Sequence, residues 1–411
     1  MGSRYFYGWN VVGATFVMAL WSFGLGFYGL TVYVAALQSL HGWSAATVST
    51  PVTVYYVAGA LVTVVIGQVY QRFGPQLVVG AGSVAMAAGV AALGIVTDPW
   101  QLYPVFLVMS LGWGAMSGAA INIILAPWFE RRRGFVVSIA FNGATLGGVI
   151  VAPALIPLIG AVGFSRALAT AASLLVVTLL AVSAGVMRRG PEVRGLGPDG
   201  GPPRTAGTGP AGGGGRWRRG DALRTWRFWS VSAPFALGLA AQVGVLTHLV
   251  ALVTPALGVA GAAWAVSTAT AAAIIGRLVT GVVVDRLNRR VVASATLTVQ
   301  AVGLALLAPA PSAGFVYAGC ALFGLGVGNL TSLPGLILAV EWPPERFGSL
   351  VSLVVGINQF TFAFGPSLVG VMRDWTGAYG AAVGACIVLQ ATAAVVLLLG
   401  PRRVPSTIGQ G

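Results

Sequence analysis

Long apolar runs recur along the whole chain of 411 residues and constrain its fold more than any other feature. About 20 mostly apolar residues in a helix cross the hydrocarbon core of a bilayer. Only helices and closed barrels satisfy the backbone in lipid, and these runs are too long and uniformly apolar for barrel strands. The sequence therefore predicts an all-α membrane protein with twelve transmembrane helices. They are expected at residues 10–35, 46–69, 76–96, 101–126, 135–158, 164–187, 227–253, 261–284, 291–309, 313–339, 349–371 and 378–400.

The overall composition agrees with this class. Charged residues make up only 8% of the chain, whereas a soluble chain has about 25%. The two cysteines are isolated in apolar runs, so no metal site or disulfide framework is indicated. We also find no catalytic triad and no nucleotide-binding fingerprint in a soluble domain. We therefore expect a protein that is not an enzyme and has neither a metal nor a cofactor.

The distribution of basic residues predicts the orientation. All 23 basic residues are arginines. Arg166 and Arg373 lie in loops on one side of the predicted membrane and Arg277 lies inside a run, while all the others lie on the second side. Because cytoplasmic loops are enriched in basic residues, both termini are expected in the cytoplasm. The net charge of +14 is thus a topology signal and not one for nucleic acid. We expect a multi-pass protein of the bacterial cytoplasmic (inner) membrane that functions as a monomer in the lipid bilayer.

The chain divides into two similar halves. Residues 188–226 are rich in glycine, proline and arginine, which is typical of a flexible cytoplasmic linker. This linker separates one predicted six-helix bundle, residues 1–187, from another, residues 227–411. Two loop motifs recur with one offset of 214 residues, from 67 to 281 and from 134 to 348. The repeat predicts duplicated, pseudo-symmetric halves.

These motifs also resemble a known family. The pattern G-x3-D-R-x2-R-R resembles the conserved loop of the major facilitator superfamily, and is formed by Gly281, Asp285, Arg286, Arg289 and Arg290. Three further stretches resemble the monocarboxylate and oxalate transporter group: YGWNVV at 7–12, WFERRRG with FNGATLGG within 128–148, and THLVAL around His248. The resemblance implies a transporter with its substrate site near the membrane midplane, between the halves.

The conserved loop offers candidates for a gate. The Asp285 carboxylate could pair with arginines or cap the N-terminus of a neighbouring helix, and Gly281 and Arg286 belong to the same motif. The first-half copy has Gln71 in place of the acid, followed by Arg72. Contacts of this kind would hold the halves in one state and break in the other. The alternative is a basic loop that only ends the helix and sets its orientation.

Arg277 is the strongest candidate for substrate binding. All nine acidic residues lie in loops or at the ends of the predicted helices, and Asp285 is about 12 Å away along a helix. A mid-membrane arginine costs roughly 2.5–3.5 kcal/mol and almost always faces a cavity. Its guanidinium fork matches a carboxylate, so a substrate anion is the expected partner; the resemblance implies the same carboxylate anchor. The alternative is an arginine bonded to backbone carbonyls or extended towards the cytoplasm.

Other polar and aromatic side chains complete the predicted site. His248 can change charge near neutral pH and could bind substrate or carry a proton; an interhelical hydrogen bond is the alternative. The remaining candidates share a position in the apolar runs that would face a central cavity, and simple helix packing is the alternative for each. They are Tyr28, Asn142, Asn358, Gln359 and Phe362.

The function expected from these features is secondary active transport of a small organic anion by alternating access. Monocarboxylates such as lactate and pyruvate are the expected substrates, with protons as the coupling ion. An anion exchanger or an exporter of a neutral, drug-like compound is the alternative among transporters. A non-transporting membrane sensor is the alternative from another class.

Overall fold

The computed structural model describes residues 5–43, 45–188, 190–202, 219–308 and 312–401. Every regular element in this described part is a helix. Eleven helical stretches are long and apolar enough to cross a membrane. One of them, Thr50–Leu93, is two spans joined at a bend, so the prediction of an all-α protein with twelve transmembrane helices is confirmed.

The first half of the chain contains spans one to six. Its elements are α1 (Gly8–Phe23), the π-helix η1 (Gly24–Tyr28), α2 (Gly29–His41), α3 (Ala45–Leu93), the 3-10 turn η2 (Pro99–Gln101), α4 (Leu102–Met116), α5 (Gly118–Leu125), α6 (Arg133–Leu146), the π-helix η3 (Gly147–Val151), α7 (Ala152–Val162) and α8 (Phe164–Val186). Spans two and three are both in α3, and the chain reverses between them at Gly74, where φ is +73°. Glycine adopts this conformation without a Cβ clash.

The second half contains spans seven to twelve. Its elements are α10 (Trp226–Val284), α11 (Arg289–Leu307), α12 (Ala313–Gly326), α13 (Asn329–Glu341), α14 (Pro344–Phe362), α15 (Gly365–Thr376) and α16 (Gly380–Leu398). Spans seven and eight are both in α10 and separate at Gly258, where φ is +68°. Spans ten and eleven are each interrupted, between α12 and α13 and between α14 and α15. Interrupted helices free backbone groups at membrane depth, which is tolerated where they are buried in protein or line a cavity.

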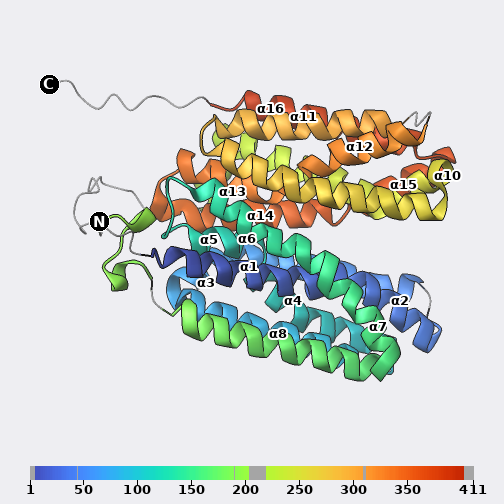
Figure 1. Ribbon diagram of the computed structural model, residues 1–411, viewed down its shortest axis with the longest axis horizontal. Coiled ribbons are helices and arrows are strands. Elements are labelled where there is room, and N and C mark those ends of the chain that lie inside the picture. The colour runs from blue at the N-terminus through green and yellow to red at the C-terminus, as the bar shows by residue number, and fades with distance from the viewer. Residues whose placement is uncertain (1–4, 44, 189, 203–218, 309–311, 402–411) are drawn as a thin grey trace.

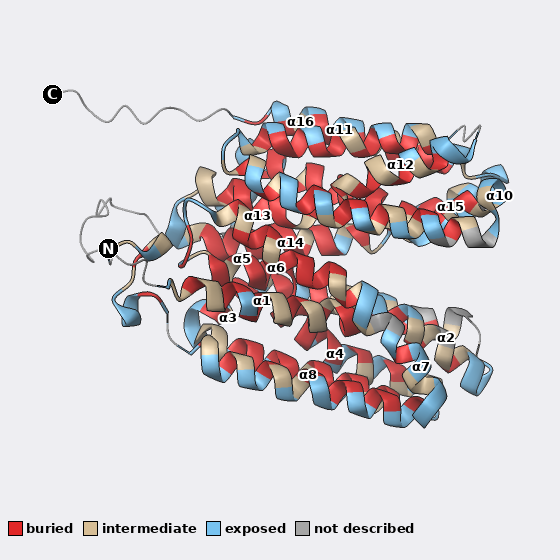
Figure 2. Ribbon diagram, viewed as in Figure 1, coloured by how far each residue is buried: buried red, intermediate tan, exposed pale blue. Residues whose placement is uncertain are grey.

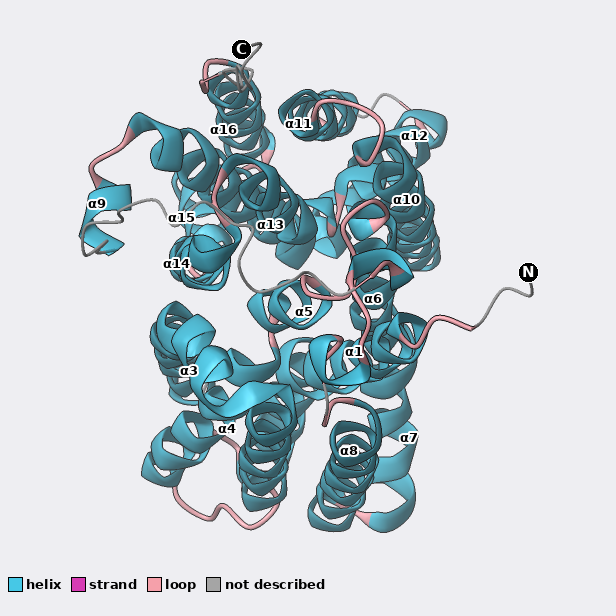
Figure 3. Ribbon diagram, turned by 90° about the vertical axis from the view of Figure 1, so that its left-hand side faces the viewer, coloured by secondary structure: helices cyan, strands magenta, loops and turns pink. Residues whose placement is uncertain are grey.

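The two halves form two adjacent bundles. In Figure 1 the helices α1 to α8 make up the lower group and α10 to α16 the upper group. Figure 3, seen from the end where α1 begins, shows α5 and α6 of the first bundle facing α13 and α14 of the second. We call this end the basic face, because the arginine-rich loops lie there. It is on the left in Figure 1.

The bundles meet mainly near the basic face. Across the seam, α3 packs against α14 and α10 packs against α6. On the opposite side of the membrane, α2 and α7 pack mainly against elements of their own half. Buried residues are accordingly concentrated where α5, α6, α13 and α14 meet (Figure 2). The structure is thus closed between the halves on the basic face.

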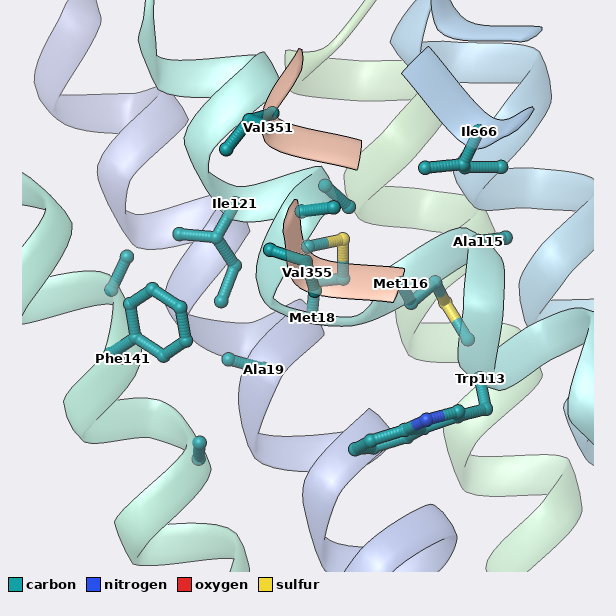
Figure 4. Close-up of a cluster of buried hydrophobic side chains, with 14 of the residues drawn as sticks. Met18, Ala19, Ile66, Trp113, Ala115, Met116, Ile121, Phe141, Val351 and Val355 are labelled. Atoms are coloured by element: carbon teal, nitrogen blue, oxygen red, sulfur yellow. The ribbon is translucent and has the colours of Figure 1, made fainter. Parts of the chain in front are cut away.

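An apolar layer fills this part of the seam. Val351 and Val355 of α14 lie close to Met18, Met116 and Ile121 of the first half (Figure 4), and all five are buried. Burial of apolar area contributes about 25 cal/mol per Å². The layer therefore stabilises the closed arrangement through apolar contacts.

The linker between the bundles is only partly described. Residues 189 and 203–218 of the predicted linker lie outside the described residues. The described part contains the short turns η4 (Glu192–Arg194) and η5 (Pro198–Gly200) and the helix α9 (Arg219–Leu223). Its first part, residues 190–202, contacts the first bundle at the basic face.

Candidate functional site

Arg277 lies in the seam between the two halves. It is in the last part of α10 and only 5% of its surface is exposed. Its Nη1 donates hydrogen bonds to the carbonyl of Phe141 and to Oγ1 of Thr145, the latter at 2.7 Å. Both acceptors are in α6, so this one side chain joins span eight of the second half to span five of the first. Among the described residues its hydrogen-bond partners are neutral.

The interruption of span ten makes room for this guanidinium. Gly328, between α12 and α13, has φ +84°, and a Cβ on it would overlap the Arg277 guanidinium. Arg277 Nε is buried and has no hydrogen-bond partner. An arginine has five N–H donors, so this side chain has donor capacity beyond the two bonds it makes.

Aromatic rings lie next to Arg277. The Arg277 guanidinium carbon is 5.7 Å from the centroid of the Phe141 ring. The Tyr28 ring packs on the backbone of Gly148, and its hydroxyl is within electrostatic range of Arg277. Across the seam, Phe362 lies 6.4 Å from Phe27, between ring centroids. The structure therefore places Tyr28 near Arg277 and Phe362 at the junction of the halves, and a role for either ring in substrate binding stays a prediction.

The three predicted amides have different environments. Gln359 Oε1 accepts a hydrogen bond from Thr63 at 3.0 Å, which links span eleven to span two across the seam. Asn358 and Asn142 are buried, and the Oδ1 atom of each has no hydrogen-bond partner. Asn142 directly follows Phe141, the residue that accepts from Arg277. A role for these amides in substrate binding stays a prediction.

His248 makes its contacts within the second half. Its Nε2 is 3.1 Å from the Pro366 carbonyl, and its Nδ1 is 3.2 Å from the Tyr379 hydroxyl. Because a carbonyl can only accept, Nε2 carries the hydrogen of the bond to Pro366. His248 thus connects span seven with spans eleven and twelve, and among the described residues it shares no hydrogen-bond partner with Arg277. Its roles in substrate binding and in proton coupling stay predictions.

Asp285 binds the start of a helix in the other half. Its two carboxylate oxygens accept from the backbone N–H groups of Gly134, at 2.8 Å, and Phe135, at 3.1 Å. These donors are in the first turn of α6, where the helix dipole favours a negative charge. Burial raises the pKa of the Asp285 carboxyl, and the two N–H donors oppose this shift. The predicted capping of a neighbouring helix is therefore present in this state.

The two copies of the repeated motif make equivalent contacts. Gly281 packs closely against Ser138 and the carbonyl of Gly134. At the positions 214 residues apart in the repeat, Gly67 packs closely against the carbonyl of Gly348. Each pair joins the halves at the basic face, one through span eight and the other through span two. The two copies of the repeated motif therefore make a pair of equivalent glycine contacts between the halves.

The two remaining gate candidates lie outside this contact. Arg72 and Arg286 are exposed, and the Arg72 guanidinium carbon is 5.2 Å from the ring centroid of its neighbour Phe73. Sequence reasoning had not selected Phe141 and Thr145, the acceptors for Arg277. A carbonyl and a threonine hydroxyl give no signal in an apolar run.

Comparison with known proteins places this arrangement in a family. The sequence pattern described as Major Facilitator Superfamily matches residues 16–261 and 249–410. The chain belongs to the major facilitator superfamily. It is therefore a membrane transporter and not an enzyme, and the predicted superfamily is confirmed.

Individual relatives are more distant. The protein is 26% identical over 361 residues to "MFS-type transporter 1" of Ophiocordyceps sp., covering 86% of this chain and 75% of that relative. It is 24% identical over 311 residues to "Agnestins efflux protein AgnL12" of Paecilomyces divaricatus, covering 71% of this chain and 64% of that relative. The E. coli fucose:proton symporter FucP has the same fold, with a TM-score of 0.71, 14% identity and coverage of 97% of this chain and 100% of that one. The monocarboxylate and oxalate subgroup stays a prediction.

Proposed function

We propose that this transporter carries small organic anions, monocarboxylates above all, by alternating access around Arg277. One observation carries the proposal. Arg277 is a buried cation at the junction of the halves, and its hydrogen-bond partners among the described residues are a backbone carbonyl and a hydroxyl. An arginine at this depth pairs with another ionisable group or with backbone carbonyls, as Arg277 does here with Phe141, and such residues mark substrate pathways. A substrate carboxylate would supply the missing charge.

The same contacts suggest how binding would be coupled to movement. An arginine and a carboxylate can form two parallel hydrogen bonds between opposite charges, whereas both present acceptors of Arg277 are neutral. A bound carboxylate would therefore compete with the Phe141 carbonyl and Thr145 for the Arg277 donors. Because both of those acceptors belong to the other half, their release would weaken the seam. Opening on the basic face would then also require Asp285 to leave the first turn of α6, which is the gate role we propose for it.

Uptake by the purified protein in liposomes tests this proposal. We expect labelled lactate or pyruvate to enter faster when an inward proton gradient is imposed. Loss of a hydrogen bond to a charged group costs about 1.5–3 kcal/mol, so Arg277→Ala should reduce uptake at low substrate by roughly ten- to a hundredfold. Arg277→Lys keeps the charge but loses the fork and should be intermediate. Arg166→Ala, which changes an exposed arginine elsewhere, is the matched control. Equal uptake by Arg277→Ala and the control would refute the site.

Proton symport is the coupling we propose, with either His248 or the substrate carboxyl carrying the proton. His248→Gln distinguishes the two carriers. If His248 carries the proton, this variant exchanges substrate across the membrane but is no longer accelerated by the gradient. If the substrate carries it, the acceleration remains. A wild-type protein that exchanges anions without any response to the gradient would instead be an exchanger.

Export of a larger organic compound is the second candidate. It is favoured by the name of one relative, an efflux protein for agnestins, and by the aromatic rings at the seam. Transport of a neutral compound by Arg277→Ala at the wild-type rate would support export over carboxylate transport. For the location we propose a bacterial cytoplasmic membrane with the basic face inside, although both relatives named above are fungal.

A further inference from the structure

The first part of the linker is bound to the basic face of the first bundle. The Arg194 guanidinium carbon lies 3.5 Å from the centroid of the Tyr7 ring, at the start of α1. Leu196 packs against the buried apolar core. These two contacts bring the following turn, Pro198–Gly200, to the loop between α5 and α6.

Asp199 in this turn binds that loop through three hydrogen bonds. Its Oδ2 accepts from the backbone N–H groups of Glu130, at 3.0 Å, and Arg131, at 2.8 Å. Its own N–H donates to the carbonyl of Trp128 at 2.9 Å. Asp199 has φ +56° and is the one residue other than glycine with positive φ in the described part of the chain. Aspartate and asparagine are the side chains that tolerate this conformation best.

The loop that binds Asp199 also binds Asp285, the proposed gate residue. Residues 128–135 present two pairs of backbone N–H groups, one pair to Asp199 and the next pair to Asp285 of the second half. Each of the two carboxylates thus has its own pair of donors in this loop. The conformation of this loop therefore determines whether Asp285 can accept hydrogen bonds from Gly134 and Phe135.

We propose that Asp199 is a positioning residue for transport. It fixes the loop 128–135 in the shape that directs the N–H groups of Gly134 and Phe135 towards Asp285, and so favours the state that is closed on the basic face. Asp199 itself contacts no substrate. The proposal rests on alternating access and on the proposed gate role of Asp285, and it is independent of which substrate is carried.

Substitutions at Asp199 distinguish the effect of losing the hydrogen-bond acceptor from the effect of changing the backbone conformation. Both loop donors bind the same oxygen, so Asp199→Asn keeps an acceptor for both and also tolerates positive φ. Asp199→Gly keeps the conformation and removes the acceptor. The exposed Glu192 on the same segment provides the control, since Glu192→Gln removes a charge without touching the loop.

The measurement is the distance between spin labels on the two halves, by double electron–electron resonance, without substrate. Labels on cysteines at the exposed positions Leu77 and Leu287, with Cys320 and Cys386 replaced by alanine, report on the basic face. Asp199→Asn and Glu192→Gln should match the unsubstituted protein. Asp199→Gly should raise the ratio of long to short distances about tenfold, which corresponds to about 1.4 kcal/mol.

A second variant protects the test against misfolding. Arg194→Ala weakens the same docked segment from its other end and leaves Asp199 in place, so it should shift the distances in the same direction by a smaller amount. An unchanged distance distribution in both Asp199→Gly and Arg194→Ala would overturn the proposal. So would an Asp199→Asn protein as shifted as Asp199→Gly, because a neutral acceptor should suffice. If Asp285→Ala shifts the distances and Asp199→Gly does not, the proposed gate role of Asp285 stands and only the role of Asp199 is refuted.

Discussion

At the scale of single residues, Arg277 combines a buried charge with weak partners. Its two hydrogen bonds go to neutral oxygens of the opposite half, and its Nε has none. A buried charge held by neutral groups is costly compared with one that is paired. In the transport cycle that we propose, a substrate anion would replace these contacts.

Thr145 tests this exchange of partners. Thr145→Val keeps the shape of the side chain and removes one competitor for the Arg277 donors. If a carboxylate must displace this hydroxyl, apparent substrate affinity should rise about fivefold, in line with a net hydrogen bond of roughly 1 kcal/mol. Transport KM measures the effect. Thr170→Val, at an exposed threonine of α8, is the control, and a weaker affinity in Thr145→Val would mean that the hydroxyl binds the substrate.

Gly328 tests the space around the guanidinium. In Gly328→Ala the new Cβ would overlap Arg277, and the positive φ would cost a further 1–2 kcal/mol or so. We expect transport to be lost at substrate concentrations that saturate the natural protein. Gly314→Ala, in the same span, should transport normally, because a Cβ there would meet only the Ser312 hydroxyl oxygen at an ordinary contact distance of 3.8 Å. Normal transport by Gly328→Ala would show that the guanidinium can move aside without loss of function.

At the scale of helices, the repeated motif joins the halves through one contact on each side of the pseudo-symmetry axis. Gly281 meets Gly134, and Gly67 meets Gly348. Close approach of two helix backbones needs small residues at the contact. The acidic cap exists only on the side of Asp285, because the other copy of the motif has Gln71 in its place.

Both glycine contacts should be needed for closure. A Cβ at residue 281 would lie 2.7 Å from the Ser138 Cβ, far inside van der Waals contact, and one at residue 67 would overlap the Gly348 carbonyl. Gly281→Ala and Gly67→Ala should therefore each shift the labelled pair at 77 and 287 towards longer distances. Gly384→Ala, where nothing surrounds the new methyl group, is the control. Distances unchanged in both variants would contradict closure through these contacts.

At the scale of the whole molecule, the bilayer makes much of the fold predictable. Lipid requires long apolar helices, so twelve spans could be read from hydropathy, and the offset between motifs revealed the two halves. The burial of Arg277 followed from its position among small and aliphatic residues. A charged residue in a hydrophobic run is informative, because few environments inside a membrane protein can stabilise a buried charge.

Side-chain partners were not predictable in the same way. Gln359 bonds to Thr63, and His248 to the Pro366 carbonyl. Such contacts depend on how each helix is rotated and where it is interrupted, and hydropathy carries little information on either. The contact of Asp199 with the loop 128–135 was the least predictable, because Asp199 lies in a segment rich in glycine and proline whose composition indicates only a linker.

Recognition of a carboxylate by Arg277 is the central claim, and thermal stabilisation of the detergent-solubilised protein by small acids tests it most directly. A ligand that binds only the folded state raises the melting temperature in a concentration-dependent way. We predict that at least one acid among lactate, pyruvate, oxalate and benzoate stabilises the natural protein and Arg166→Ala, but not Arg277→Ala. Equal stabilisation of Arg277→Ala, or none of the natural protein by any of these acids, would contradict the account.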